Sequence, residues 1–319
     1  MREGGPKAFW LSLVLTLSVL LPLMAAVVFW GAWQNRGAAP ADREQSGIPV
    51  RSPGGQHSFN VLAVVAEDPA AFVLLRLDAG KNRIAVTALP GETVLNSPAG
   101  PVLLAQSYRE AGPARAVQCL EATLGIRIRH YVAITAEKLG QAFAPLGTAR
   151  VNLTSLLTEA ERSAAGFGGP VQEFTPASAV EFLASVPMEP PRRAALRGAV
   201  WEAFVRQNLE QLPREVPDGL RLVSSSLLTS LTAMDLYTLA DTLEFLADRE
   251  GITEAARLPG RWDGASQRYE LQPDAPAWAA QKFGGAVAQV QPPAVLATPT
   301  ASPKPSPTPQ PPAMAGGLQ

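Results

Sequence analysis

The chain has 319 residues, 47% hydrophobic and 17% charged, which is enough apolar material for one large domain or two small ones. Its 27 basic and 28 acidic residues leave a formal net charge of -1, which excludes a strongly basic surface for nucleic-acid phosphates. The single cysteine, Cys119, excludes an internal disulfide and a thiolate zinc site.

The first pattern along the chain is an uncharged apolar run over residues 8–33. It exceeds the ~20 residues that cross a bilayer and is too long for the apolar part of an ordinary signal peptide. Trp10 lies near one end and Trp33 near the other, where amphipathic rings favour the interfaces. The short basic flank, residues 1–7, is typical of a signal anchor. We expect a cytoplasmic N-terminus, a transmembrane helix over 8–33 and a single-pass protein of the cell membrane. A cleaved signal peptide is the alternative.

Two further segments lack the pattern of a folded domain. Residues 34–57 are rich in Gly, Pro, Ala and charge without periodicity, which predicts a linker. Nine prolines fall between Pro292 and Pro312, so residues 287–319 are predicted to form a disordered tail. The tail is either a spacer, a tolerated appendage or a segment that reaches a partner.

The remaining residues, 58–286, alternate strand and helix patterns. Strands are expected at 60–65, 71–77 and 83–89, which form a hairpin meander, and again at 129–135 and 151–153. Helices are expected from Gly112-Pro113 to Leu124, then at 136–146, 176–185, 192–212 and 233–247. Strands with interspersed helices predict a single extracytoplasmic α/β domain with a central mixed sheet.

The order of several short motifs resembles the LytR-CpsA-Psr (LCP) family of cell-envelope proteins. The hairpin ends in Leu89-Pro90, the Gly112-Pro113 helix ends in a Leu-Gly-Ile motif, and a strand then opens with His130-Tyr131. The closing motifs are Met234-Asp235-Leu236, Leu239-Ala240, Leu258-Pro259-Gly260 and Asp263-Gly264-Ala265-Ser266.

This resemblance implies an αβα fold whose apolar pocket holds a polyprenyl chain. It also implies arginines and carboxylates that bind a pyrophosphate and Mg²⁺, and transfer of glycopolymers from the lipid to peptidoglycan. Such a site needs guanidinium partners for the pyrophosphate and hard oxygen ligands for the metal. The partners implied are the membrane and a polyprenyl-linked lipid or envelope polymer, with an envelope protein as a further candidate and no nucleic acid.

The sequence departs from the family at most of the polar positions. Aligned by hand, small or apolar residues replace them: Ala70, Gly91, Leu103, Ala105, Ala184, Val186, Ala194 and Gly198. Glu92 keeps a carboxylate and Arg197 keeps one guanidinium of the helix signature. Each charge-assisted hydrogen bond contributes roughly 1.5–3 kcal/mol, so the losses predict weak or absent catalysis.

The surviving candidates are few. Glu92 is the candidate catalytic carboxylate, and Glu67, Asp68 and Glu92 are the candidate Mg²⁺ ligands, although Glu67-Asp68-Pro69 also fits a solvated loop. The candidate ligand-binding arginines are Arg197, Arg192 and Arg193, which alternatively form a solvated helix face. The only histidines, His57 and His130, lack the pattern of a catalytic triad.

The sequence leaves three alternative functions. The first is a membrane-anchored LCP-like pseudoenzyme that binds polyprenyl-(pyro)phosphate-linked glycopolymer precursors with weak or no catalysis. The second is an active phosphotransferase that attaches glycopolymers to peptidoglycan through Glu92 and Arg197. The third is a non-enzymatic envelope interaction protein.

Overall fold

A computed structural model describes residues 52–284 of the chain. The predicted transmembrane helix and the predicted tail lie outside these residues. Within 52–284, no helix is both long enough and apolar enough to cross a membrane. The described residues belong to one compact unit, which begins at Ser52.

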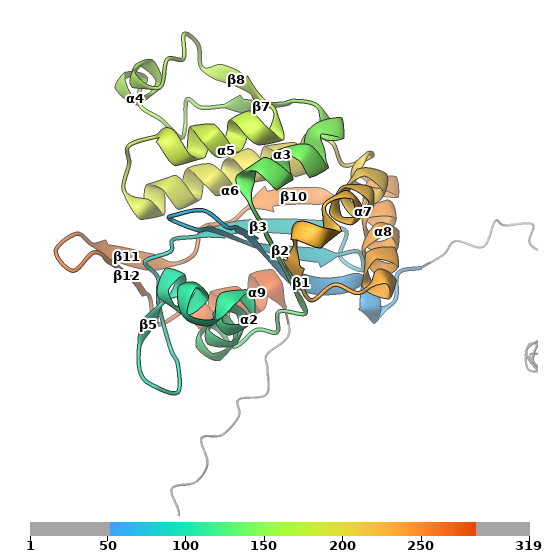
Figure 1. Cartoon of the computed structure of the whole chain (residues 1–319), viewed down its shortest axis with the longest axis horizontal. Helices are drawn as coiled ribbons and strands as arrows, with labels where there is room; N and C mark the ends of the chain where they lie inside the picture. The colour runs from blue at the N-terminus through green and yellow to red at the C-terminus, as the bar shows by residue number, and fades with distance from the viewer. Residues whose placement is uncertain (1–51, 285–319) are drawn as a thin grey trace, which may run out of the picture. The chain divides into compact units, whose positions relative to one another are not determined.

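A six-stranded mixed sheet forms the centre of the described domain, in the order β10-β3-β2-β1-β6-β9 (Figure 1). Strand β1 pairs antiparallel with β2 and parallel with β6, and β10 pairs parallel with β3, so the predicted mixed sheet is confirmed. The strands are β1 (Ser58–Val65), β2 (Ala71–Asp78), β3 (Arg83–Leu89), β6 (His130–Ile134), β9 (Leu228–Thr229) and β10 (Ile252–Ala255).

The predicted meander of β1, β2 and β3 is confirmed in its register. These strands are apolar on both faces, as expected for a sheet covered on both sides. Asp78 fixes the β2–β3 turn, because its carboxylate accepts hydrogen bonds from the Ser58 hydroxyl at 2.8 Å and the Lys81 amide at 3.1 Å. Asn82 takes the positive φ, 50°, that the turn requires.

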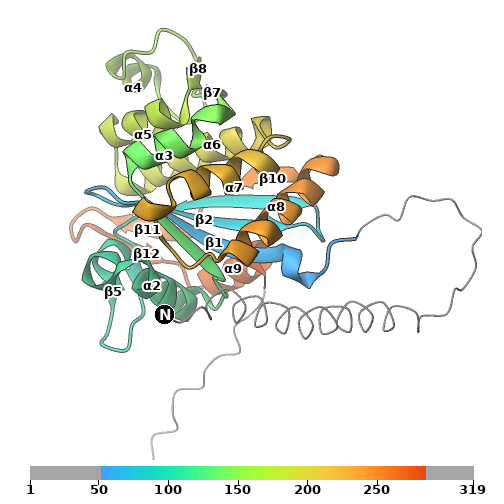
Figure 2. The same cartoon turned by 45° about the vertical axis from the view of Figure 1, so that its right-hand side comes forward.

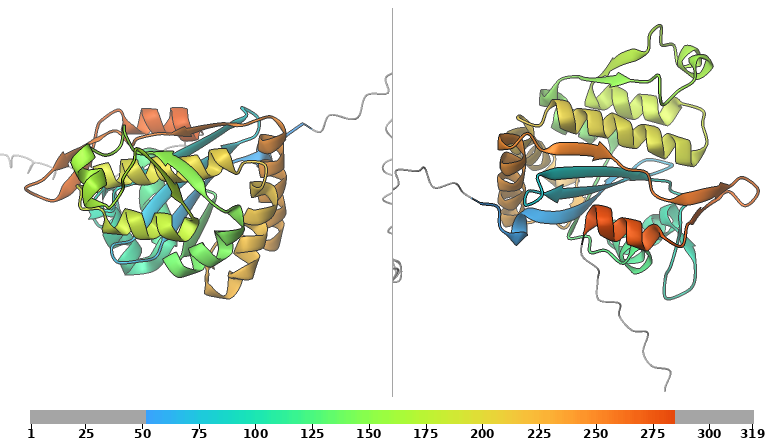
Figure 3. Two further views of the ribbon diagram at one scale, coloured as in Figure 1. Left: turned by 90° about the horizontal axis from the view of Figure 1, so that it is seen from above. Right: turned by 180° about the vertical axis from the view of Figure 1, so that it is seen from behind.

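Helices cover the two faces of the sheet (Figures 1 and 2). On one face α2 (Leu104–Leu124) and α9 (Ala275–Phe283) pack on Leu62, Val64 and Leu74. On the other face lie α3 (Ala136–Phe143), α6 (Pro190–Gln207), α7 (Leu212–Leu222) and α8 (Ala233–Asp248). The view from behind in Figure 3 shows α9 and α6 on opposite sides of the sheet, so the layers are αβα.

One helix prediction missed a preceding segment, and another was wrong at its end. α2 begins at Leu104 rather than at Gly112, and the backbone leaves helical geometry at Ala111 and Gly112, where Gly112 has φ 71°. A helical segment therefore begins after Gly112, as predicted, and the segment from Leu104 to Glu110 before the kink is the part that the sequence did not indicate. The predicted helix 192–212 ends at Gln207, and α7 starts at Leu212 with Pro213 in its first turn.

A small module sits on the outer side of α6. Strand β7 (Ala149–Asn152) pairs with β8 (Val171–Phe174), and α4 (Glu159–Ala164) lies between them in the chain. The predicted strand at 151–153 thus belongs to a separate hairpin and not to the main sheet. With α5 (Pro176–Ser185), the module builds its own apolar cluster against α6 around Phe174, Phe182 and Leu196.

The rest of the domain consists of short elements, one of which, at 144–146, lies within the helix predicted over 136–146. They are η1 (Gly55–His57), β4 (Val94–Leu95), β5 (Val102–Leu103), η2 (Ala144–Leu146), η3 (Ser224–Ser226), β11 (Gly260–Asp263) and β12 (Arg268–Leu271). Residues 55–57 were predicted to be linker. His57 is instead buried at 4% exposure, and its Nδ1 lies 3.1 Å from the Thr242 hydroxyl of α8.

Candidate functional site

Three strands of the sheet have their carboxyl ends on the same side, which we call the carboxyl edge. β1, β3 and β6 run in the same direction, so their carboxyl ends meet at this edge. Glu67 follows β1, and Glu92 follows β3. Ligand sites in open α/β sheets occur at such carboxyl edges. The topology therefore places two of the predicted carboxylates at the expected edge.

Arg197 comes to the same edge from α6, which packs on β3. The approach is close because Gly198 has no side chain: a Cβ there would lie 3.5 Å from the Ala88 backbone nitrogen. Arg197 is only partly exposed. Within the described part of the chain, no hydrogen bond or ion pair holds its guanidinium. A buried charge normally has a partner, so this arginine has the character of an anion-binding group.

The charges around Arg197 shift its pKa in opposite directions. Burial and the neighbouring charge of Arg193 lower the pKa of Arg197 to about 10, while Glu92 and Glu67 act to raise it. The guanidinium stays protonated at neutral pH. Three residues named from the sequence, Arg197, Glu92 and Glu67, are thus close enough to interact electrostatically.

The other predicted ligands are placed differently. Asp68 is exposed, and no interaction between it and Arg197 was found. Arg193 lies one helical turn before Arg197; it donates one hydrogen bond to the Met188 carbonyl at 3.1 Å, while its buried Nε has no partner. Its free N–H is therefore a second donor on the Arg197 face of α6.

Arg192 already has a partner. It donates two hydrogen bonds to Glu161 of α4, at 2.7 and 3.0 Å. This bond is the main cause that lowers the pKa of Glu161 to about 2, and the Thr158 cap of α4 adds to it. Arg192 therefore connects α4 to α6 and is not free to bind a ligand while that pair holds.

Small residues occupy the positions where the LytR-CpsA-Psr resemblance expects polar groups. A Cβ on Gly91 would lie 3.2 Å from the Ala105 Cβ and 3.9 Å from the Ala70 carbonyl oxygen. The Ala105 amide also donates to the Gly91 carbonyl at 2.8 Å. The three replaced positions are thus neighbours in space. They leave no side chain that can bind a phosphate or move a proton.

Other replaced positions are closed by packing. Val186 is 2% exposed and Ala194 3% exposed, both inside apolar clusters. An arginine cannot enter either position without displacing its neighbours. Ala184 instead lines a groove of about 550 Å³ between α3 and α5, together with Glu67, Glu137 and Glu181.

An apolar cavity lies between the sheet and the helices on the Arg197 side. It has a volume of about 230 Å³, and aliphatic and aromatic side chains from β1, β2, β6, α3, α6, α7 and α8 line it. Val65 of its lining precedes Glu67 by two residues, and Trp201 follows Arg197 by one helical turn. Two residues of the lining are therefore close in the chain to Glu67 and Arg197.

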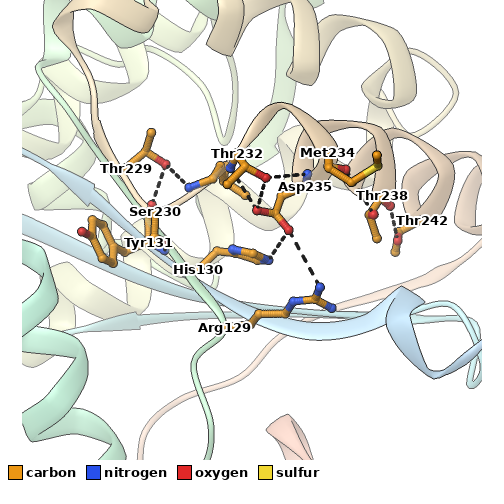
Figure 4. Close-up of polar contacts among 11 residues, drawn as sticks. Arg129, His130, Tyr131, Thr229, Ser230, Thr232, Met234, Asp235, Thr238 and Thr242 are labelled. Carbon is orange, nitrogen blue, oxygen red and sulfur yellow. Dashed lines mark hydrogen bonds and ion pairs between the residues drawn. The ribbon is translucent and has the colours of Figure 1, made fainter.

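A second polar cluster lies at the opposite edge of the sheet (Figure 4). Asp235 caps α8 by accepting hydrogen bonds from the Thr232 amide and hydroxyl, at 2.9 and 2.7 Å. Its other oxygen lies 3.7 Å from His130 Nε2 and 3.8 Å from Arg129. Burial lowers the pKa of His130 despite Asp235, so the ring is neutral at pH 7. The capping bonds give this cluster a structural role.

No group of three or more His, Cys, Asp or Glu side chains in residues 52–284 is arranged to hold a metal ion. Mg²⁺ commonly takes only one or two protein carboxylates when substrate phosphates complete its shell. The Mg²⁺ ligands named from the sequence therefore stay a prediction.

Comparison with solved structures identifies the fold. A protein from Eubacterium siraeum, provisionally described as a transcription regulator, superposes with a TM-score of 0.63 at 16% identity, over 77% of this chain and 98% of its own. TagT of B. subtilis gives 0.55 at 14% identity, over 78% and 100%. TagT bound to LIIa-WTA gives 0.57 at 13% identity, over 77% and 100%.

The domain has the LytR-CpsA-Psr fold. This agrees with the family resemblance drawn from the motif order. No family model and no curated protein matches the sequence. At these identities the LytR-CpsA-Psr likeness establishes the fold, and the chemistry depends on the side chains of this chain.

The sequence indicated Arg197, Glu92 and Glu67 but not the groups that connect them to the cavity. Trp201 was not named as a site residue, and the lining from α7 was missed because no helix was predicted between Leu212 and Leu222. The one signal present was the spacing of Arg193, Arg197 and Trp201, which places all three on one face of α6.

Proposed function

We propose that this protein is a membrane-anchored, LCP-like cell-envelope protein. It binds polyprenyl-(pyro)phosphate-linked glycopolymer precursors and transfers them weakly or not at all. The apolar cavity takes part of the polyprenyl chain, and Arg197 binds the phosphate head outside it.

The observation that carries this proposal is an apolar cavity close to a partly buried positive charge. An apolar cavity of about 230 Å³ is lined by Trp201, which lies one helical turn after Arg197 on α6, and the guanidinium of Arg197 has no hydrogen bond or ion pair among residues 52–284. A ligand that satisfies both must have a long apolar chain and an anionic head. The TagT complexes with LIIa-WTA and LI-WTA, which share the fold, support a ligand that carries an envelope polymer.

The proposal of weak catalysis depends on the cluster of small residues. Gly91 lies beside both Ala70 and Ala105, where polar groups are expected. Glu92 is the one remaining carboxylate at this turn that could accept a proton from an attacking hydroxyl. A single positioned base contributes about 10²- to 10⁴-fold, far below a complete phosphotransfer site.

Magnesium fits this site only together with substrate. Glu67 and Glu92 would supply two hard oxygen ligands, and phosphate oxygens would complete the shell. The ion would neutralise charge on the pyrophosphate. Arg197 and Arg193 would orient the phosphate through their N–H groups, whether or not the metal is present.

Binding is tested with farnesyl pyrophosphate, farnesol and inorganic pyrophosphate on the full chain in detergent, by calorimetry. Farnesyl pyrophosphate should bind more tightly than farnesol or inorganic pyrophosphate. Arg197→Met should remove the preference for farnesyl pyrophosphate over farnesol. Arg206→Met is the matched control, because Arg206 lies on the same helix but is exposed and paired with Glu202 at 3.0 Å. If Arg197→Met and Arg206→Met lose the preference for farnesyl pyrophosphate equally, the proposed role of Arg197 is wrong.

Catalysis is tested separately. The full chain is incubated with a polyprenyl-pyrophosphate-linked sugar, Mg²⁺ and peptidoglycan, and release of polyprenyl monophosphate is followed. We expect slow or no release. Rapid turnover that Glu92→Gln abolishes would instead support the active phosphotransferase.

A further inference from the structure

The segment that joins α7 to α8 is uncharged and exposes large apolar side chains. From Leu222 to Met234 there is no Asp, Glu, Lys or Arg. Leu222 and Met234 are each 72% exposed, and Leu228 and Tyr237 are each 60% exposed. We call these four side chains the α7–α8 face. Exposed apolar residues gathered in this way mark an interaction surface.

The α7–α8 face lies along one side of the domain. Leu228 belongs to β9, the edge strand that pairs antiparallel with β6. Val223, just after Leu222, packs with Val65 and Ile134 at the carboxyl edge of the sheet. Met234 lies in the first turn of α8 at the other edge, next to Asp235 (Figure 4). The face therefore runs beside the cavity from the Arg197 edge to the opposite edge.

The same chain segment also lines the cavity. Leu220, Leu231 and Leu239 are part of the lining, while Leu222 and Tyr237 point outward from neighbouring positions. This wall thus has apolar side chains on both its inner and its outer surface. An apolar chain that leaves the cavity through it meets no charged group within residues 222–234.

The groups around the face fit a membrane interface. The Arg221 guanidinium lies 5.7 Å from the centre of the Tyr237 ring. Arginine and tyrosine both place an apolar body in the bilayer boundary and a polar end in water. The remaining polar residues between Leu222 and Met234 are serines and threonines, which carry no charge.

The chain enters the domain close to this face. His57 is tied to α8 through Thr242, and its ring lies 5.0 Å from that of Phe245. Thr242 follows Tyr237 by five residues, which is about 8 Å along a helix. Residues 34–51 precede the described domain and can extend at most about 65 Å from the predicted membrane span. The chain therefore enters the described domain beside α8, the helix that carries Met234 and Tyr237.

We propose that the α7–α8 face docks on the lipid bilayer and opens the cavity toward it. This inference rests on the proposed function, since it gives the polyprenyl chain a route from the membrane to Arg197. A second copy of the chain fits less well. The exposed edge strand β9 has only two residues, too few for sheet extension between copies.

The test places a fluorescent label on Met234→Cys in the full chain, reconstituted into phosphatidylethanolamine–phosphatidylglycerol vesicles. Some of the lipids carry a nitroxide on the acyl chain, which quenches only nearby labels. The matched control is Val171→Cys, which is exposed at 43% on β8. Cys119 is 1% exposed and burial raises its pKa, so wild-type protein checks for background labelling.

We expect the lipid nitroxide to quench the label at position 234 several-fold more than the label at 171. Equal quenching at both positions would overturn the docking proposal. Protection from aqueous iodide without nitroxide quenching would indicate a protein contact at this face and would also overturn it. In a Met234→Asp, Tyr237→Asp chain that carries Leu228→Cys, the quenching at position 228 should fall to the level at 171.

Farnesyl pyrophosphate binding in detergent separates this proposal from the proposed function. The Met234→Asp, Tyr237→Asp chain should bind it as wild type does, because neither side chain lines the cavity. If wild type fails to bind it, the proposed function fails. If wild type binds but position 234 remains in water, only the docking face fails.

Discussion

Filling the apolar cavity should stabilise the protein while it weakens ligand binding. Ala63 lies on β1 and lines the cavity, which is larger than the side chain of isoleucine. Ala63→Ile adds three carbons, which at ~0.8 kcal/mol each contribute about 2.4 kcal/mol. The lost rotamer freedom of isoleucine costs about 0.5–1 kcal/mol. The free energy of unfolding should therefore rise by about 1.5 kcal/mol, which corresponds to about 3–6 °C in Tm.

The effect on binding has the opposite sign. The three added carbons occupy space that the isoprenoid would fill, so the ligand loses a similar ~2.4 kcal/mol of burial. At 1.4 kcal/mol per factor of ten, farnesyl pyrophosphate should bind roughly 50-fold more weakly. Few substitutions raise stability and lower affinity together, which makes the pair of measurements specific for a ligand cavity.

The adjacent strand offers a matched control. Ala133 of β6 is 3% exposed and faces the opposite side of the sheet, where it packs in the cluster with α2. Ala133→Ile should overpack that cluster and destabilise the protein by about 1–3 kcal/mol.

Thermal and urea unfolding measure stability, and calorimetry measures affinity. If Ala63→Ile destabilises as Ala133→Ile does, the cavity is not a usable space. If it stabilises without weakening binding, the ligand lies elsewhere.

Three further predictions concern other parts of the domain. A Cβ on Gly219 would lie 2.3 Å from the Ala142 carbonyl oxygen, so Gly219→Ala should cost about 3 kcal/mol in urea unfolding; an unchanged midpoint would show that α7 and α3 can separate freely. Burial lowers the folded pKa of His130 below 6.5, so the unfolded chain binds more protons and stability falls as the pH drops below about 6.5. His130→Phe should lose that part of the acid dependence, and an unchanged pH profile would contradict it. Gly91→Arg should destabilise the fold without restoring transfer, because its Cβ meets Ala105 at 3.2 Å; turnover gained on Mg²⁺ addition would refute this.

The sequence by itself determined the meander and most of the helices. Strands β1 to β3 are apolar on both faces, and continuous apolar runs of that length are predicted from hydrophobicity alone. The cap residue Gly125 also acts locally and marks a helix end from the sequence. The motif order was sufficient to suggest the LytR-CpsA-Psr fold, which the structural comparison bears out.

Short elements could not be found in this way. Strands β9 and β10 have two and four residues, and they exist because β6 and β3 offer them a free edge. Their hydrogen bonds come from partners about 100 to 170 positions away in the chain. No local pattern of so few residues distinguishes them from loops.

Only the tertiary structure decided what the candidate residues do. Arg192 and Arg197 are both arginines on one helix, yet Arg192 forms an ion pair with Glu161, while no partner holds Arg197 within residues 52–284. The difference arises because α6 contacts α4 on one side and the carboxyl edge of the sheet on the other. The sequence determined which charges survive, and packing decided which one lies beside the apolar cavity.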